Sequence, residues 1–292
     1  MSIIYSFIIP HKNCPDLLKR CVNSIPVRDD VQIIIVDDNS DKGKKAAITR
    51  REAEVVLLDR ESSKGAGRAR NEGLKRATGK WLVFADSDDF FTESLLVSLD
   101  KYKDSEADLI LFKADSVDSD TLEKSNRHGG INAKIDSVLN GEEDARLVAL
   151  EIEVPWCKMV RNDFVQKNQI TFDEVLASND TMFSTKVTCL ANNIEMSEDV
   201  LYVVTTRTGS LWNTRKKPAN YLSRICVYIN RCKYLKEHGY PATPLIMSYM
   251  SLGYIDVKTN IKALWLILKN GCMFSGMGSY VVKQYKKRRK RI

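Results

Sequence analysis

The apolar residues of the first 114 positions form short continuous runs that alternate with helical patterns. The run 81–85 is apolar on both faces, follows Gly79 and ends at an acidic cluster, which is typical of a buried strand in a mostly parallel sheet. Similar runs predict strands at residues 3–9, 31–36, 55–58 and 108–114, and helical spacing predicts helices at 15–25, 65–79 and 95–102. The alternation indicates an α/β fold with a doubly wound, mostly parallel sheet.

The later segments are less regular. Residues 41–53 are basic and favour a helical connection, whereas the polar segment 115–141 favours a loop or a weak hairpin. Beyond these, the pattern predicts helices near 142–152, 162–167 and 180–191, a strand at 200–205, a loop at 205–213 and mainly helices from residue 218 onward. Lysines interrupt the amphipathic segment 261–282, so we expect it to lie at an interface or to pack, not to span a membrane.

The composition is that of a globular protein, with 43% hydrophobic and 28% charged residues in 292 positions. The seven cysteines contain no CxxC pair, which argues against a zinc site or a disulfide framework and fits reduced thiols in a cytoplasm. The apolar residues 3–9 are too few for a signal peptide and have no basic segment before them, so none is expected.

The net charge of +7 comes from one segment. Residues 283–292 contain seven Lys or Arg and no acid, and the rest of the chain has 38 basic and 38 acidic residues. A nucleic-acid-binding body would be expected to carry a basic face of its own. The pattern instead favours a basic tail that meets an anionic surface, such as the inner face of a cell membrane.

Three carboxylates, Asp86, Asp88 and Asp89, follow the predicted strand at 81–85. Open α/β sheets bind their ligands at the carboxyl ends of the strands. Clustered carboxylates repel one another, and Mg²⁺ or Mn²⁺, which prefer oxygen ligands, would relieve that repulsion. The alternative for an isolated cluster of this kind is a turn with helix-capping aspartates.

Seven segments together carry a likeness to a known family. They are FIIPHKN (7–13), CVNSIP (21–26), IIIVDDNS (33–40), GAGRARNEGLKRATGKWLVFADSDD (65–89), WCKMVRNDF (156–164), NDTMF (179–183) and RTGS (207–210). In content and order they resemble the family-2 glycosyltransferases, which have the GT-A fold. The resemblance implies a GT-A domain at 1–212, with a nucleotide-binding half at 1–114 and an acceptor half at 115–212. A helical extension at 213–292 with the basic tail would follow.

The resemblance implies transfer of a sugar, with inversion, from a nucleotide-diphosphate donor to a hydroxyl of a glycan or lipid-linked acceptor. The family's DxD motif corresponds to Asp86-Ser87-Asp88. Asp88 is then the expected direct ligand of Mn²⁺ or Mg²⁺, and Asp86 a second metal ligand or a ribose contact. Asp89 would point toward the acceptor. The metal would offset the negative charge of the leaving diphosphate.

The same likeness implies a set of nucleotide-sugar contacts. Asp37 and Asp38 correspond to carboxylates that bind base and ribose, and Arg70 would lie beside the donor pocket. Pro10 would begin the loop under the nucleotide. The chain departs from the family's PTYN form there, so His11 or Lys12 would replace the usual aromatic contact. Alternatives are an Asx turn for the Asp37 pair and a solvated helix charge for Arg70.

The family's catalytic base follows a glutamate, and here it corresponds to Asp180 preceded by Asn179. The alternative role for Asp180 is to cap the helix at 180–191. The QxxRW motif of processive synthases is absent, which favours addition of a single sugar. The family's habits and the basic tail point to bacterial cell-surface polysaccharide or lipopolysaccharide synthesis.

Three other functions were weighed against this one. GAGRAR (65–70) lacks the third glycine of a dinucleotide fingerprint and precedes its strand, so that function is disfavoured. A nucleotide-sugar-forming nucleotidyltransferase would need a Gly-rich basic loop after the first strand, which FIIPHKNCPD does not supply. A membrane-docked scaffold that has kept the fold but lost turnover is the non-enzymatic alternative, and Asn179 gives it some support.

Overall fold

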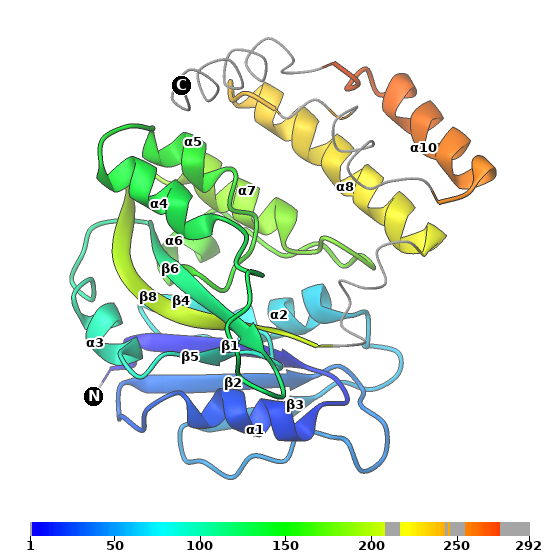
Figure 1. Cartoon of the computed structure of the whole chain (residues 1–292). Helices are drawn as coiled ribbons and strands as arrows, with labels where there is room; N and C mark the ends of the chain where they lie inside the picture. Colours follow the sequence, from blue (N-terminus) through cyan, green and yellow to red (C-terminus); the bar gives the residue numbers. More distant parts are fainter. Residues whose placement is uncertain (1, 208–216, 243–244, 246–254, 275–292) are drawn as a thin grey trace.

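The computed structural model describes residues 2–207, 217–242, 245 and 255–274 (Figure 1). Within these residues, one eight-stranded sheet has the order β3-β2-β1-β4-β7-β6-β8-β5. The strands are β1 (Tyr5–His11), β2 (Val31–Asp37), β3 (Ala53–Leu57), β4 (Trp81–Phe84), β5 (Phe90–Phe91), β6 (Leu109–Asp118), β7 (Lys158–Arg161) and β8 (Ile194–Thr206).

Parallel pairing dominates this sheet. Strands β3, β2, β1 and β4 are parallel neighbours, and β6 is parallel to β8. Strand β7 is antiparallel to β4 and β6, and the short β5 is antiparallel to β8. The prediction of an α/β fold with a mostly parallel sheet is therefore confirmed.

Helices cover the sheet and then extend away from it (Figure 1). They are α1 (Pro15–Asn23), α2 (Ala66–Leu74), α3 (Leu95–Asp100), α4 (Ile131–Leu139), α5 (Ala145–Ala149), α6 (Asn162–Lys167), α7 (Thr181–Leu190), α8 (Pro218–Glu237) and α10 (Val257–Lys269). Helix α2 packs on β1 and β2, and α4 packs on β6 and β8. Helix α8 packs on α7 and α10 packs on α8, so α10 is the outermost member of this stack.

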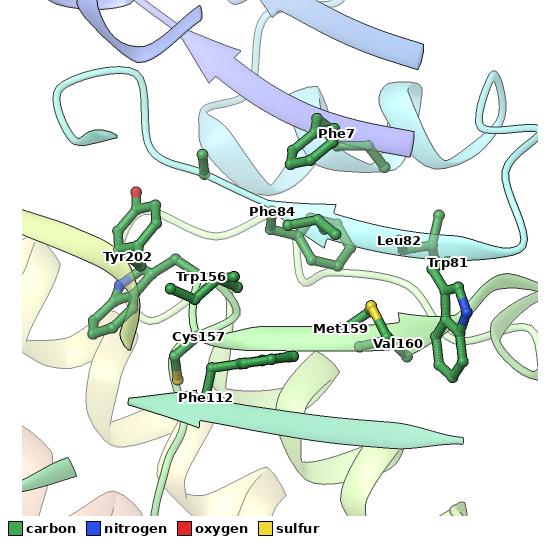
Figure 2. Close-up of a cluster of buried hydrophobic side chains, with 14 of the residues drawn as sticks. Phe7, Trp81, Leu82, Phe84, Phe112, Trp156, Cys157, Met159, Val160 and Tyr202 are labelled. Carbon is green, nitrogen blue, oxygen red and sulfur yellow. The ribbon is translucent and has the colours of Figure 1, made fainter. Parts of the chain in front are cut away.

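Strand β4 runs through the centre of the core, and all four of its side chains are fully buried. Figure 2 shows its Phe84 between Phe7 of β1 and the residues of β7. The Phe84 ring also makes edge contacts with Phe172 and Phe183, at 5.2 and 5.3 Å between centroids. These contacts dock the segment before α7, and α7 itself, onto the strand that ends at the acidic cluster.

A glycine makes this docking possible. A Cβ atom on Gly67 of α2 would lie 2.1 Å from the carbonyl oxygen of Asp173. Any side chain at that position would therefore push the 172–179 segment away from α2. Gly67 belongs to the GAGRAR stretch, so close packing explains part of its glycine content.

The structure corrects several sequence-based predictions. Residues 41–52 form no helix, because Asp37 binds the amide of Ala46 and Gly43 adopts a positive φ of 83°. The first strand does not end at residue 9, because β1 continues through Pro10 to His11. Segment 115–141 contains the end of β6, a bridge between Val117 and Lys124, and helix α4, which was not predicted.

Helices α8 and α10 share a second apolar core with the sheet domain, to which Leu150 and Cys189 contribute. Arg231 of α8 is buried and donates to Thr185 at 3.0 Å and to the carbonyl of Leu150 at 2.5 Å. No helix within the described ranges combines the length and the hydropathy needed to cross a bilayer. Residues 208–210 of the RTGS segment, Trp212 and the tail at 283–292 lie outside the described residues.

Candidate active site

The ends of β1 and β2 meet at one edge of the sheet, where His11 pairs with Asp37 in register. Asp37 is buried and accepts three hydrogen bonds, from the amides of Ser40 (2.7 Å) and Ala46 (2.8 Å) and from Nδ1 of His11 (2.9 Å). Burial opposes the charged form, but these donors outweigh it and hold the pKa of Asp37 below its usual value. Asp37 therefore braces the turn after β2.

His11 is buried in the same cluster. Its Nδ1–H donates to Asp37, and its Nε2 accepts the backbone N–H of Cys14 at 3.3 Å. Both ring nitrogens are thus engaged within the protein, so a direct nucleotide contact of His11, as predicted, would require one of these hydrogen bonds to be exchanged. Pro10 lies inside β1, not in a loop, because its position pairs with Val36 of β2. Pro10 and His11 therefore stabilise the strand ends on which the candidate site is built.

Asp38 and Lys12 lie at the same edge but are less tightly held. Asp38 accepts the amide of Gly65 at 3.2 Å and Lys12 Nζ at 3.3 Å. Both contacts are long, and half of the Lys12 side chain is exposed. These two residues, and not Asp37 and His11, have polar atoms that could be redirected to a ligand.

The end of β4 presents two partly exposed carboxylates. Asp86 accepts Arg70 Nη2 at 2.5 Å and keeps 38% of its side chain exposed. Asp88 accepts Arg207 Nε at 3.2 Å and is 24% exposed. Each carboxylate is therefore held by one arginine and still reaches solvent.

The third carboxylate of the cluster has a different environment. Asp89 is buried, and accepts the amide of Thr205 at 2.7 Å and the hydroxyl of Tyr202 at 3.0 Å. Burial and the neighbouring Asp88 and Asp86 raise its pKa well above the usual value. Asp89 ties the acidic turn to β8 through these two hydrogen bonds.

Arg70 joins the two halves of the site. While Nη2 binds Asp86, Nη1 donates to the side-chain oxygen of Asn179 at 2.8 Å. Its guanidinium carbon lies 5.3 Å from the centroid of the Phe172 ring, which fixes the plane of the fork. The predicted alternative of a solvated helix charge does not apply, because Arg70 is only 4% exposed.

Asp180 directly precedes α7 and is half-buried. Its side chain makes no capping hydrogen bond to the helix, so capping does not account for its presence. Burial raises the pKa of Asp180, and the charge of Arg70 partly opposes that rise. A carboxylate with a raised pKa beside an arginine is suited to accept a proton.

A buried polar network behind Asp180 was not predicted from the sequence. Lys158 of β7 is fully buried and donates to the carbonyl of Ile152 at 2.6 Å. Burial lowers its pKa to about 8, and the charges of Asp180 and Glu153 partly oppose that effect. Glu153 accepts the hydroxyl of Thr181, the first residue of α7, at 2.9 Å and lies 3.6 Å from Arg231 of α8.

The carboxylates at the end of β4 fit a divalent cation only in part. Across the described residues, no group of three or more His, Cys, Asp or Glu side chains could hold a metal ion. Two carboxylates are nevertheless what Mg²⁺ commonly takes from a protein when water and substrate phosphates supply the other ligands. Asp86 and Asp88 therefore suit a metal that arrives with a diphosphate.

Residues 6–168, more than half of the chain, match the family model described as Glycosyl transferase family 2. The chain belongs to glycosyl transferase family 2. It is 28% identical over 207 residues to a poly(ribitol-phosphate) beta-glucosyltransferase of Bacillus spizizenii, which covers 68% of this chain and 31% of that protein. It is 25% identical over 234 residues to the glycosyltransferase GlyG of Streptococcus pneumoniae, covering 73% and 74%. The chain thus spans less than a third of the Bacillus relative.

Solved structures of family-2 type share the fold. A fragment of S. aureus TarS in complex with UDP-GlcNAc matches with a TM-score of 0.61 at 21% identity, covering 79% of this chain and 66% of that one. The mannosyltransferase PcManGT from Pyrobaculum calidifontis, in complex with GDP-Man and Mn²⁺, matches with a TM-score of 0.54 at 13% identity, covering 99% and 83%. At these identities the likeness establishes the GT-A-like fold alone.

Proposed function

We propose that the chain transfers one sugar, with inversion, from a nucleotide-diphosphate donor to an acceptor hydroxyl. The observation that carries the proposal is the double hydrogen bond of Arg70 to Asp86 and Asn179. It holds Asp86, one of the two carboxylates that suit a diphosphate-bound metal, beside Asn179, the residue directly before Asp180. Burial raises the pKa of Asp180, the candidate base. Arg70 thus connects a proposed metal ligand on the donor side with the segment that carries the proposed base on the acceptor side.

On the donor side, Asp88 and Asp86 would hold Mn²⁺ or Mg²⁺. When bound, the ion would supply Lewis-acid stabilisation of the diphosphate charge. Asp38 and Lys12 would contact the nucleotide, because their present hydrogen bonds are long and exchangeable. Asp37 and His11 would keep the turn that carries Asp38 in place.

On the acceptor side, Asp180 would act as the general base. The acceptor oxygen would attack the anomeric carbon on the face opposite the diphosphate. As that bond forms, the bond from carbon to the phosphate oxygen breaks, and its electron pair leaves with the nucleoside diphosphate. Asp180 takes the hydroxyl proton, a role that the amide of Asn179 cannot fill.

The relatives' names suggest the kind of substrate. One acts on poly(ribitol-phosphate), and the matching TarS structure contains UDP-GlcNAc. We infer a uridine-diphosphate sugar as donor and a bacterial cell-surface glycan or its lipid-linked precursor as acceptor. The basic tail at 283–292 would hold the enzyme at the anionic inner face of the cell membrane, with the active site in the cytoplasm.

The test is a panel of nucleotide sugars with Mn²⁺ or Mg²⁺, scored by release of the nucleoside diphosphate. We expect release with one donor, loss of release in EDTA, and recovery when the metal is restored. Full release in chelator would refute the metal assignment. Specific donor binding without release would favour a catalytically inactive scaffold. The scaffold is the second candidate because Asn179 stands where the family has an acid.

A further inference from the structure

Helix α10 carries different residues on its two sides. Its inner side packs on α8, with Ala263 and Ile267 in the shared core. Its outer side carries four large apolar side chains that are 54% to 64% exposed, here called the apolar stripe: Val257, Ile261, Trp265 and Leu268. Spacings of four, four and three residues place them along one line of the helix. The described part of the chain leaves this stripe uncovered.

A row of lysines borders the apolar stripe. At roughly 100° of rotation per residue, Lys258, Lys262 and Lys269 fall together on the flank next to Trp265. The Nζ atom of Lys269 lies 4.8 Å from the centroid of the Trp265 ring. No Asp or Glu occurs from residue 257 to the end of the sequence. The outer side of α10 is therefore apolar along one line and positively charged along the next.

We propose that α10 is a membrane-docking helix whose apolar stripe enters the headgroup region of an anionic lipid bilayer. The helix has 13 residues, too few to cross the hydrocarbon core, so it lies along the surface. Tryptophan is enriched at that depth, and lysines extend to the lipid phosphates. The inference deepens the membrane-associated glycosyl transfer proposed above and rests on it for the acceptor.

Charge favours a bilayer over a second copy of the chain. Two α10 helices facing each other would bring two lysine rows together, with no acid on either helix to offset them. An anionic bilayer complements the apolar stripe and the lysine row at once. The position of α10 also has a consequence, because α8 links it to α7, which begins at Asp180 (Figure 1). Docking would put the bilayer on the outer side of the helix stack to which α7 belongs, and we infer that a lipid-linked acceptor reaches Asp180 from there.

The test is co-sedimentation of the full chain with vesicles of phosphatidylcholine alone or mixed with phosphatidylglycerol. The variant Ile261→Gln/Trp265→Gln/Leu268→Gln removes most of the stripe but keeps good helix formers. We expect its partition onto the mixed vesicles to fall about tenfold or more, since three side chains no longer leave water. Replacing the three lysines of α10 with Gln should instead weaken the preference for the anionic lipid, and the seven cationic residues of the tail at 283–292 should retain part of it.

The matched control is Val97→Gln/Leu139→Gln/Leu147→Gln, which changes three apolar residues that are 42% to 69% exposed on other helices. It should bind vesicles like the unaltered chain. Equal binding by the stripe variant, or a stripe-dependent dimer that ignores vesicles, would overturn the proposal. Nucleotide release with a soluble acceptor, measured without vesicles, should persist in the stripe variant. If the unaltered chain docks but turns over no donor, the glycosyl-transfer proposal fails while the docking helix stands.

Discussion

At the end of β2, Asp37 accepts three hydrogen bonds from within the protein and is buried. At the end of β4, the side chain of Asp86 accepts a hydrogen bond from Arg70 and is 38% exposed. The two residues have the same side chain at the same edge of one sheet. The number of fixed donors around each carboxylate distinguishes Asp37, which stabilises a turn, from Asp86, which we propose as a ligand residue.

The kind of donor matters as well as the number. Backbone amides, such as those of Ser40 and Ala46, cannot move without breaking the turn after β2. An arginine side chain can keep one contact while it releases another, so Asp86 and Asp88 can exchange partners when a charged substrate binds. Asp180 extends the series, since its side chain makes no capping hydrogen bond to α7.

The largest expected effect follows from changing Asp180. Asp180→Asn keeps the shape but removes the basicity. We expect kcat to fall by roughly 10²–10⁴, the range for loss of a general base, while donor binding stays nearly intact. Steady-state kinetics and donor titration measure the two quantities separately.

Glu174→Gln is the matched control, because Glu174 lies nearby but is paired with Arg68 at 3.3 Å and Lys64 at 3.7 Å. It should leave kcat close to that of the unaltered chain. A normal kcat in Asp180→Asn would instead direct the search for the base to Asp173, whose pKa is also raised by burial.

The next effect sharpens the contrast between the two strand ends. Asp88→Asn should lower kcat by roughly 10²–10³, because an amide is a poorer metal ligand and the diphosphate charge is less well stabilised. Its urea-unfolding midpoint should match that of the unaltered chain, since Asp88 is partly exposed. A large loss of stability with unchanged kcat would mean that Asp88, like Asp37, stabilises the fold and does not take part in catalysis.

Asp37→Asn is expected to show the opposite behaviour. The new amide nitrogen would face donors on Ala46, His11 or Ser40, leaving at least one buried group unpaired. We expect a loss of about 1–3 kcal/mol in unfolding free energy, measured in urea. Asp38→Asn should cost less, because its contacts to Gly65 and Lys12 are longer. Equal losses in both variants would contradict the proposal that Asp37 stabilises the turn and Asp38 contacts the nucleotide.

The strands of the sheet differ in how clearly the sequence predicts them. Strands β1, β2 and β4 were predictable because each is a continuous apolar run, buried on both faces. Strands β5 and β7 were missed because they are short and their partners lie far away in sequence, as Phe90 pairs with Val203. Helix α4 buries one side chain, Ile135, so its periodicity was weak.

Within the candidate site, the family motifs predicted Asp86, Asp88 and Asp180, but no local pattern separates Asp37 from Asp38. Their difference depends on amides several residues away. Arg231 lies far from Glu153 and Lys158 in sequence, so the network of these three residues was not visible. One signal was available, since Lys158 interrupts the apolar run Trp156–Val160, and a lysine inside a buried run needs a partner.

The smallest expected effect concerns the pH dependence of turnover. Burial raises the pKa of Asp180, and Arg70 partly opposes that rise by favouring the ionised form. Because the base acts when ionised, kcat/KM should fall as the pH drops through this pKa, so the acid limb should lie above the value of about 4 for an ordinary carboxyl. Arg70→Gln removes the opposing charge and should move the limb of the residual activity to higher pH. Arg68→Gln, two residues away on α2 and paired with Glu174, should leave the limb in place. An unmoved limb in Arg70→Gln would mean that the titrating group is not Asp180.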